Sequence, residues 1–276
     1  MRFILIGLLL VWNSALAQPD PFPKVASSYL VQLNDTLLWE RQANRRLPPA
    51  SLTKLMTALL VLDNYQPRGV VEIGKQAAQE TGMRLGLKPG QRFYVEDLLS
   101  AALINSGNDA CHALADFIAG DHREFVRLMN QRAKQLGMRN THFSNACGHD
   151  ASDHYSTAQD LALLAHELLK NKVVTRLAVK ESVQISPVGE TKSYTLQNKN
   201  ALIGRYQGAL GLKTGYTPKA GTCLIAYAER DSARVLLVML NASNRWWDAV
   251  DLLDLAFAQV RVSAQKNIST QKQHAP

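Results

Sequence analysis

The sequence has few cysteines, no internal repeats and no apolar run long enough to cross a membrane. Its three cysteines, Cys111, Cys147 and Cys223, exclude the dense disulfide framework of small secreted scaffolds. Their neighbours are apolar or helical in pattern, which is typical of buried thiols, so the sequence leaves open whether two of them form a disulfide. The lack of repeats, low-complexity segments and long linkers favours one domain, or two interleaved lobes, for a chain of this length.

The longest apolar run lies at the start of the chain, between Phe3 and Trp12. It spans about ten residues, whereas a helix that crosses a bilayer needs roughly 20. Arg2 precedes the run and a small-residue triplet ending at Ala17 follows it, which is the pattern of a secretory signal. We therefore interpret residues 1–17 as a cleaved signal peptide and predict a periplasmic protein with no stable membrane anchor.

Positive charge exceeds negative charge, but no single segment holds it. Lys and Arg number 31 and Asp and Glu 23, which gives a net charge of +8. A basic surface suits an anionic partner such as nucleic acid, lipid or an anionic polymer. The basic residues are scattered and no basic stripe is interleaved with aromatic residues, which argues against nucleic acid. We therefore expect no nucleic-acid partner.

Hydrophobic periodicity divides the chain into a helical middle flanked by strands. Alternating apolar and polar residues around Asn34-Asp35 predict a β-hairpin, and an almost wholly apolar pattern predicts a buried helix over 51–64. Residues 51–175 are mostly helical in pattern, with a break at Ser106-Gly107. The last predicted elements are strands within 211–215, 221–229 and 234–240 and a closing helix at about 246–261. Strands from both ends predict an α/β (α+β) fold with one sheet and a helical lobe.

A serine lies three residues before a lysine in the segment "PPASLTKLMT", at the start of the predicted buried helix. At that spacing Ser51 and Lys54 share one face of the first turn, so the amine can reach the hydroxyl. A serine becomes nucleophilic when a base takes its proton, and burial lowers the pKa of a lysine enough for that role. The alternative is structural, because serine is also a favoured helix N-cap.

Two further tripeptides add polar groups to this pair. Ser106-Gly107-Asn108 lies at the break between two predicted helices, and Lys213-Thr214-Gly215 precedes a strand. Each is a common turn sequence when considered alone. Together with Ser51 and Lys54 they form the ordered set S-x-x-K, S-x-N and K-T-G, which is the signature of penicillin-binding proteins and class A β-lactamases.

The chain resembles the low-molecular-mass penicillin-binding proteins of the serine-type D-alanyl-D-alanine carboxypeptidase family. The resemblance rests on "ASLTKLMTA", "LKPGQ", "INSGNDACHALAD", "STAQDLALLA", "LQNKN" and "GLKTGYTPKAGTC", and extends from about Ala26 to Phe257. It implies a serine β-lactamase/penicillin-binding-protein-like fold, a mainly antiparallel sheet flanked by helices with the site beside a helical lobe. On this basis we assign 18–262 to the catalytic domain and 263–276 to a polar, frayed tail.

The resemblance also implies roles for individual residues. Ser51 is the acylated nucleophile, Lys54 its general base and Ser106 a proton relay. Asn108 orients Lys54 and the substrate amide, and Lys213 supplies positive charge. The backbone N–H groups of Ser51 and Tyr216 form the oxyanion hole, and Gly215 permits close approach of the substrate backbone. The mechanism needs no metal or cofactor.

The substrates that the resemblance implies are peptidoglycan stem peptides ending in D-alanine, with β-lactams as inhibitors. We expect Thr214 and a nearby cation to bind the terminal carboxylate. Lys199 stands where many relatives have arginine, and Arg245 is the second candidate cation.

Many relatives carry an additional β-rich domain and an amphipathic C-terminal anchor, and from this sequence we expect neither. This departure leaves endopeptidase cleavage of D-alanyl cross-links as an alternative to carboxypeptidase action. A cell-wall-binding module without turnover is a third hypothesis, which the complete motif set disfavours.

Three other features suggest further chemistry, and each has a simpler interpretation. Glu167 and Asn171 have the spacing used for deacylation in class A β-lactamases, yet an amphipathic pattern predicts a solvated Glu167. The segment 149–154, "HDASDH", contains potential zinc ligands but is typical of a polar turn. For the pair Trp246-Trp247 we favour core packing at a helix start over a ligand platform.

Overall fold

The computed structural model describes residues 20–64 and 69–273. The predicted signal peptide, residues 1–17, lies outside the described residues. Within those two ranges, no helix combines the length and the apolar composition needed to cross a membrane.

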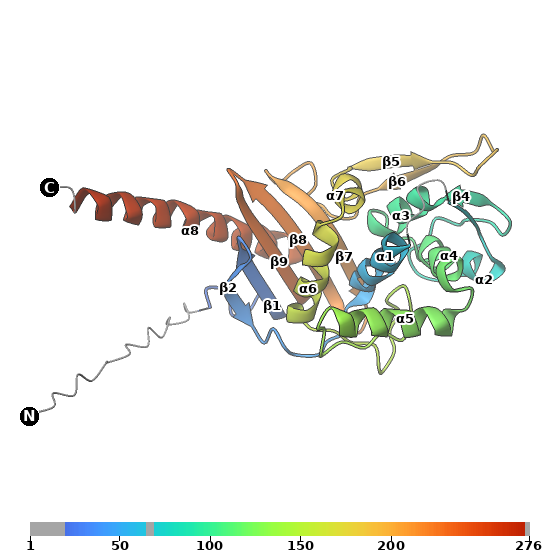
Figure 1. Ribbon diagram of the computed structural model, residues 1–276, viewed down its shortest axis with the longest axis horizontal. Helices are drawn as coiled ribbons and strands as arrows, with labels where there is room; N and C mark the ends of the chain where they lie inside the picture. The colour runs from blue at the N-terminus through green and yellow to red at the C-terminus, as the bar shows by residue number, and fades with distance from the viewer. Residues whose placement is uncertain (1–19, 65–68, 274–276) are drawn as a thin grey trace, which may run out of the picture.

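A five-stranded antiparallel sheet is built from both ends of the chain, as the sequence predicts (Figure 1). The N-terminal hairpin supplies two strands and the C-terminal region supplies three, in the order β2-β1-β9-β8-β7. These strands are β1 Ala26–Leu33, β2 Thr36–Arg41, β7 Ala209–Thr217, β8 Gly221–Arg230 and β9 Ala233–Ala242. The predicted mixed fold with an antiparallel sheet flanked by helices is confirmed.

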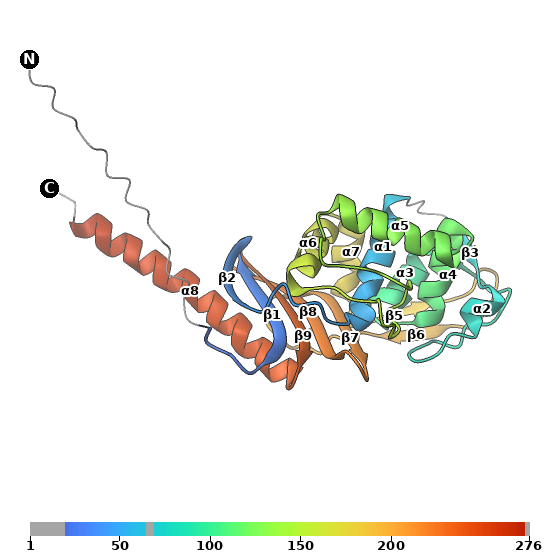
Figure 2. The ribbon, with the colours of Figure 1, turned by 90° about the horizontal axis from the view of Figure 1, so that it is seen from below.

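Helices cover both faces of this sheet, which explains why its central strands are apolar without interruption. On β9, Leu236, Val238 and Leu240 pack into the large core shared with the helical lobe. The alternate residues of the strand, such as Leu237 and Met239, pack into a second core beneath α8. Figure 2 shows α8 running along one face of the sheet while α6 lies on the other. A strand buried on both faces loses the apolar-polar alternation of a half-exposed strand.

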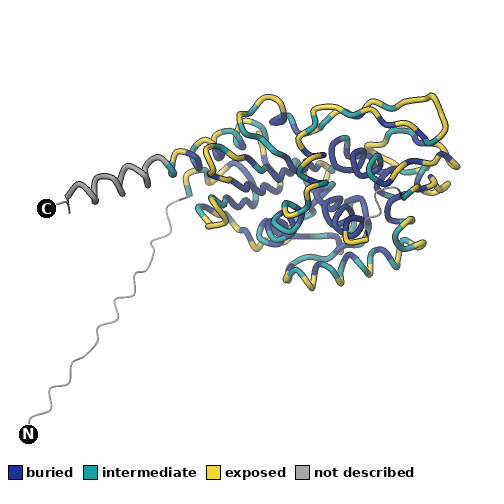
Figure 3. Tube along the Cα trace, turned by 45° about the horizontal axis from the view of Figure 1, so that its top comes forward, coloured by how far each residue is buried: buried dark blue, intermediate teal, exposed yellow. Residues whose placement is uncertain are grey.

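The helical lobe lies beside the β7 edge of the sheet and has α1 at its centre (Figure 1). Every residue of α1 from Lys54 to Leu62 is buried, including the lysine, and Figure 3 shows this helix buried along its length. The helices of the lobe and sheet cover are α1 Lys54–Asp63, α2 Lys75–Ala78, α3 Val95–Leu103, α4 Asn108–Ala119, α5 His122–Gln135, α6 Ala158–Leu169 and α7 Lys172–Ala178. Two small two-stranded antiparallel sheets complete it, β3 Val70–Glu72 with β4 Arg92–Tyr94, and β5 Ser182–Ile185 with β6 Tyr194–Gln197.

The last helix is longer than the sequence pattern predicts. Helix α8 spans Arg245–Gln273, so the predicted end near 261 is wrong. The physical reason is that polarity marks the loss of a buried face and does not by itself end a helix. Residues 262–273 contain no Pro or Gly, and Gln and Lys, which favour helix, make up five of the twelve.

Candidate active site

Ser51 lies in a short 3-10 helix, Ala50–Thr53, that leads directly into α1. The N-cap positions of the two helices are Pro49 and Thr53, and neither side chain caps, so the N-cap interpretation of Ser51 is wrong. The preceding Ala50 has a φ of 49°, a left-handed conformation that is uncommon for a residue with a side chain. The Ser51 hydroxyl is therefore free for the site, and its Oγ lies 3.0 Å from Lys54 Nζ.

Lys54 is a fully buried amine held by three oxygen atoms. Its Nζ lies 2.7 Å from both Asn108 Oδ1 and the backbone carbonyl oxygen of Cys147, in addition to the contact with Ser51. Burial lowers the pKa of Lys54 to about 7, although the negative charges of Glu80 and Asp109 oppose that shift. Near neutral pH the amine is therefore uncharged in a substantial fraction of molecules.

The hydrogen-bond pattern around Lys54 fixes the direction of its lone pair. A neutral amine has two N–H donors and one lone pair, and a carbonyl oxygen can only accept. Asn108 Oδ1 and the Cys147 carbonyl therefore take the two N–H groups of the uncharged lysine. The remaining lone pair is directed at Ser51, whose hydroxyl donates to it. This geometry suits the predicted roles of Ser51 as nucleophile and Lys54 as its general base.

A second serine–lysine pair lies beside the first. Lys213, on β7, is buried, and its Nζ donates to Ser106 Oγ and to the Thr214 carbonyl oxygen, both at 2.9 Å. Burial and the positive charges of Lys54 and Arg245 hold the pKa of Lys213 well below its ordinary value. Ser106 has a φ of 64° at the break between α3 and α4, which brings its side chain to Lys213.

Asn108 and Asp109, the first residues of α4, anchor the loop that precedes the site. Asn108 Nδ2 donates to the Thr81 carbonyl oxygen at 2.5 Å, and its backbone N–H donates to Met83 at 2.7 Å. The buried Asp109 carboxylate accepts three backbone N–H groups from residues 85–87. Asp109 is a residue that the sequence analysis missed. A charged residue directly after the Ser-Gly-Asn motif in a largely apolar helix was the available signal.

Gly148 and Gly215, which come from two distant segments of the chain, both pack against the backbone of the Ser51 turn. A Cβ atom on Gly148 would lie 2.0 Å from the Ala50 carbonyl oxygen and 2.9 Å from the Ser51 backbone nitrogen. A Cβ atom on Gly215, in β7, would lie 3.2 Å from the same nitrogen. From the sequence, we expected a glycine at 215 to let the substrate backbone approach β7. In the structure, Gly215 also lets the backbone of the Ser51 turn pack closely against β7.

The polar residues surround a cavity of about 720 Å³, which we call the active-site pocket. Eight predicted site residues line it: Ser51, Ser106, Asn108, Lys199, Thr214, Gly215, Tyr216 and Arg245. Lys54 and Lys213 lie behind this wall and reach it through their hydrogen bonds with Ser51 and Ser106. Met83, His149, Asp150 and Trp246 also line the pocket and were not among the predicted site residues.

Glu80 connects two histidines at the edge of the pocket. Its carboxylate lies 2.6 Å from His112 Nδ1 and 2.8 Å from His149 Nε2. Burial alone raises the pKa of Glu80, but the hydrogen bonds with both histidines lower it below its usual range. Asp116 and Glu80 in turn raise the pKa of His112 to about 9. Glu80 and His112 are therefore both charged at neutral pH, and the negative charge of Glu80 raises the pKa of Lys54.

On the predicted role of Lys54 as the base, the rate of Ser51 acylation should rise with pH through about 7, because only the uncharged amine can accept a proton. The second-order rate of penicillin labelling measures this profile. Glu80→Gln removes a charge that raises the pKa of Lys54, so the rise should move to lower pH. Glu72→Gln, at an exposed position, is the control and should not shift the dependence of the labelling rate on pH. A labelling rate that is flat between about pH 5 and 8 would contradict this role of Lys54.

A disulfide joins Cys111 in α4 to Cys147, and Cys223 is a buried free thiol. The Cys147 carbonyl and Asn108, also in α4, are both hydrogen-bonded to Lys54, so the disulfide links the two segments that hold this side chain. The sequence left this pairing open.

Reduction of this disulfide is expected to lower the free energy of unfolding by about 3–4 kcal/mol, because it closes a loop with a sequence separation of 36. Denaturant unfolding of the Cys111→Ala/Cys147→Ala variant, compared with the oxidised wild type, measures the effect. Thiol titration of the unfolded protein is the control. It should find one thiol before reduction and three after, and three before reduction would show that the bond is absent.

Glu167 and the segment 149–154, which suggested further chemistry in the sequence, make other contacts in the structure. Glu167 lies within 3.1 Å of Arg132 and 2.7 Å of Lys170, and it does not line the active-site pocket. The residues of 149–154 hydrogen-bond individually, with Asp150 on Thr217 and His149 on Glu80. In the part of the chain that the structure describes, no three His, Cys, Asp or Glu residues are grouped as metal ligands.

The tryptophan pair divides between two environments. Trp246 packs against the core beneath α8 and lies under the Arg245 guanidinium, 4.3 Å from the ring centroid. Trp247 is 78% exposed, so core packing is wrong for this residue.

Comparison with known proteins agrees with this geometry. The family model of the S11 peptidases, described as D-alanyl-D-alanine carboxypeptidase, matches residues 19–244. The chain is 37% identical over 273 residues to D-alanyl-D-alanine carboxypeptidase DacF of Bacillus subtilis, covering 93% of this chain and 70% of that protein.

Solved structures give the same assignment. The Streptomyces K15 DD-transpeptidase superposes with a TM-score of 0.80 at 29% identity, covering 85% of this chain and 98% of that one. A penicillin-binding protein homolog from Mycobacterium tuberculosis superposes with a TM-score of 0.82 at 30% identity, covering 88% and 95%. The chain therefore belongs to the D-alanyl-D-alanine carboxypeptidase family and is a serine-type D,D-peptidase.

Proposed function

We propose that this protein is a periplasmic carboxypeptidase that removes the terminal D-alanine from peptidoglycan stem peptides through an acyl-enzyme on Ser51. The observation that carries the proposal is the direction of the Lys54 lone pair. Two acceptor-only oxygens occupy the N–H groups of the uncharged amine and leave its lone pair for the Ser51 hydroxyl.

Acylation begins when Ser51 Oγ attacks the carbonyl carbon of the penultimate D-alanine and Lys54 takes the hydroxyl proton. The oxyanion that forms accepts hydrogen bonds from the backbone N–H groups of Ser51 and Tyr216. The close packing of Gly215 against the Ser51 backbone supports this pairing, because it brings β7 beside the Ser51 turn. The C–N bond then breaks, and the departing D-alanine receives the proton. Water attacks the ester and releases the shortened peptide.

Ser106 and Lys213 provide a path for the proton that the leaving amine needs. Ser106 lines the pocket and accepts a 2.9 Å hydrogen bond from Lys213 behind it, which supports a relay of the proton to the departing nitrogen. Thr214 follows Lys213 in β7 and lines the pocket, where its hydroxyl can bind the substrate carboxylate.

Arg245 is the better candidate for the cation that binds the terminal carboxylate. Its Nη1 donates to the carbonyl oxygens of Gly215 and Cys223 at 3.0 Å, which fixes the guanidinium at the end of β7. Arg245 also lines the active-site pocket, and a planar guanidinium can bind both oxygens of a carboxylate. Lys199 also lines the pocket, as a point charge on a flexible side chain.

Arg245→Gln is expected to reduce kcat/KM for a peptide with a free terminal carboxylate by roughly 10- to 100-fold, the range for a lost hydrogen bond to a charged group. The same peptide with a terminal amide should be much less affected, because it brings no negative charge to Arg245. Lys199→Gln is the matched comparison and should cost less. Equal losses on the two peptides would assign Arg245 a purely structural role.

Two measurements test the proposed function. Labelled penicillin should attach to the wild type and not to Ser51→Ala, and the wild type should release free D-alanine from a pentapeptide ending in D-Ala-D-Ala. Labelling of Ser51→Ala at the wild-type rate would refute the assignment of the nucleophile. Release of monomers from cross-linked dimers in preference to D-alanine would establish the endopeptidase alternative, and binding without turnover of either substrate would establish a non-catalytic module.

A further inference from the structure

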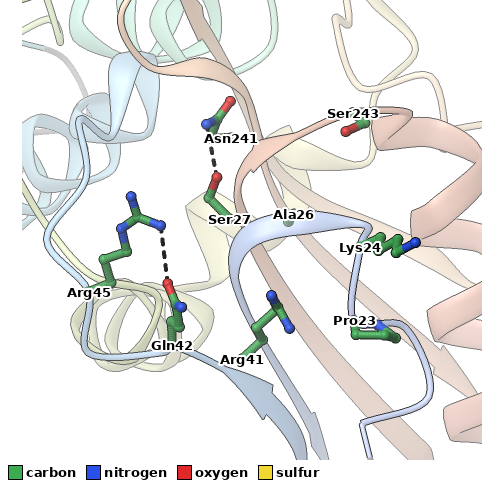
Figure 4. Close-up of a pocket in the computed structure, with 9 residues that line it drawn as sticks. All are labelled: Pro23, Lys24, Ala26, Ser27, Arg41, Gln42, Arg45, Asn241 and Ser243. Carbon is green, nitrogen blue, oxygen red and sulfur yellow. Dashed lines mark hydrogen bonds between the residues drawn. The ribbon is translucent and has the colours of Figure 1, made fainter.

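A second cavity lies near the opposite edge of the sheet from β7, where β1 begins and β9 ends (Figure 4). We call it the basic hollow, and its volume is about 400 Å³. Ser27 and Lys24 line it from the start of β1, Asn241 and Ser243 from the end of β9, and Arg41, Gln42 and Arg45 from the end of β2 onward. Its described lining residues include three cations and no acidic residue.

The two arginines of the basic hollow are only partly neutralised. The Arg41 guanidinium lies 3.7 Å from the Asp20 carboxylate, which also accepts a hydrogen bond from the Tyr29 hydroxyl. Arg45 has no acidic partner within 4.0 Å in residues 20–64 and 69–273, and it donates to the neutral Gln42 side chain at 3.1 Å. Figure 4 shows the two guanidinium groups on either side of Gln42. Such a pair suits a carboxylate or phosphate, whose oxygens arginine binds in a bidentate manner.

Neutral hydrogen-bonding groups complete the wall beside the arginines. Asn241 Nδ2 donates to Ser27 Oγ at 2.9 Å, which fixes both side chains within the hollow. The Ser28 hydroxyl and the Arg45 backbone N–H both donate to the Gln42 carbonyl oxygen, at 3.0 and 2.8 Å, and hold the segment that carries Arg45. The basic groups therefore project from restrained backbone.

The basic hollow and the active-site pocket lie at the same end of the sheet. The strand register places Ala26, Ala242, Thr222 and Tyr216 in one row across β1, β9, β8 and β7. Ala26 lines the basic hollow and Tyr216 lines the active-site pocket. Three strand spacings separate them, about 14 Å in the hydrogen-bonding direction. An extended polymer can span that distance while its peptide end lies beside Ser51.

We propose that the basic hollow binds an anionic group, a carboxylate or a phosphate, of the same cell-wall polymer whose peptide end occupies the active-site pocket. The inference rests on the proposed function for the identity of that polymer. A second contact on one polymer raises the effective concentration of the peptide end at Ser51 without changing the chemistry there. The hollow therefore favours polymeric over short soluble substrates.

The test compares two substrates in the mature enzyme carrying Arg41→Gln and Arg45→Gln. Turnover of sacculi at low concentration should fall roughly five- to tenfold, the effect of two partly exposed charge contacts. Turnover of a soluble pentapeptide should stay within twofold of the wild type. Lys172→Gln, which removes an exposed cation that lines neither cavity, should change neither rate. Unchanged turnover of sacculi, or an equal loss on both substrates, would overturn the proposal.

Sedimentation of the same proteins with sacculi measures binding without turnover, so a failure of the proposed function remains distinguishable from a failure of this inference. Binding of the wild type should exceed that of the double variant. Sacculi stripped of phosphate-bearing polymers and sacculi with amidated carboxylates identify the anion, since the advantage of the wild type should disappear with one of them. Equal binding of the wild type and the double variant to untreated sacculi would refute the basic hollow as an anion site.

Discussion

Replacing Lys54 by alanine is expected to slow acylation of Ser51 by about 10²–10⁴-fold, the usual cost of losing a general base. The expectation follows from the contacts of the amine. No other base is hydrogen-bonded to the Ser51 hydroxyl among the described residues, and Lys213 is engaged by Ser106 and the Thr214 carbonyl. The rate of labelling by penicillin under single-turnover conditions measures the effect directly.

Lys54→Met separates the base from the space that its side chain fills. Alanine leaves a cavity at a fully buried position, whereas methionine is close in length and has no basic nitrogen. We expect both variants to lose acylation to a similar extent and methionine to unfold at higher denaturant concentration than alanine. A reduction in the labelling rate of less than tenfold in either variant would reject Lys54 as the base.

The arrangement of Ser51 and Lys54 could be predicted because both residues lie in one helical turn. The spacing and the apolar surroundings indicate a shared face and a buried amine, and the structure has both. The residues that approach this pair from distant parts of the sequence could not be predicted in the same way. Ser106 and Lys213 lie far from this turn in the sequence, so their proximity was expected from the resemblance to known peptidases and not from local pattern.

The sequence does not indicate which main-chain groups contact the side chains of the site. The Cys147 carbonyl is 93 residues from Lys54, and a carbonyl oxygen is the same in every residue type. The disulfide of Cys147 was undetermined for a related reason, since three cysteines allow three pairings and only the tertiary fold chooses among them. From the sequence, Lys199 was the first candidate cation for the carboxylate and Arg245 the second. The proposal reverses that order because two hydrogen bonds fix the Arg245 guanidinium at the end of β7.

Gly148→Ala is expected to inactivate the enzyme although Gly148 takes no chemical part in the reaction. Its φ is +89°, and an added Cβ would lie 2.0 Å from the Ala50 carbonyl oxygen, closer than any real contact. The clash must move the Ala50–Ser51 backbone, which Gly215 limits on another side. A displacement of about 1 Å at a nucleophile costs on the order of 10²-fold in rate. The rate of penicillin labelling and denaturant unfolding measure the two consequences.

Gly90→Ala is the matched control, because it separates backbone strain from the steric clash. Gly90 has a φ of +82°, and a Cβ placed there meets nothing within 4 Å. Both alanines carry the cost of a left-handed conformation, about 1–2 kcal/mol. Only Gly148→Ala adds overpacking, typically about 1–3 kcal/mol more. Acylation at the wild-type rate in Gly90→Ala and its loss in folded Gly148→Ala would show that the turn must be held closely for Ser51 to react. Comparable acylation in the two variants would show that the Ser51 turn tolerates displacement, and the packing of the two glycines against it would then have no role in positioning the nucleophile.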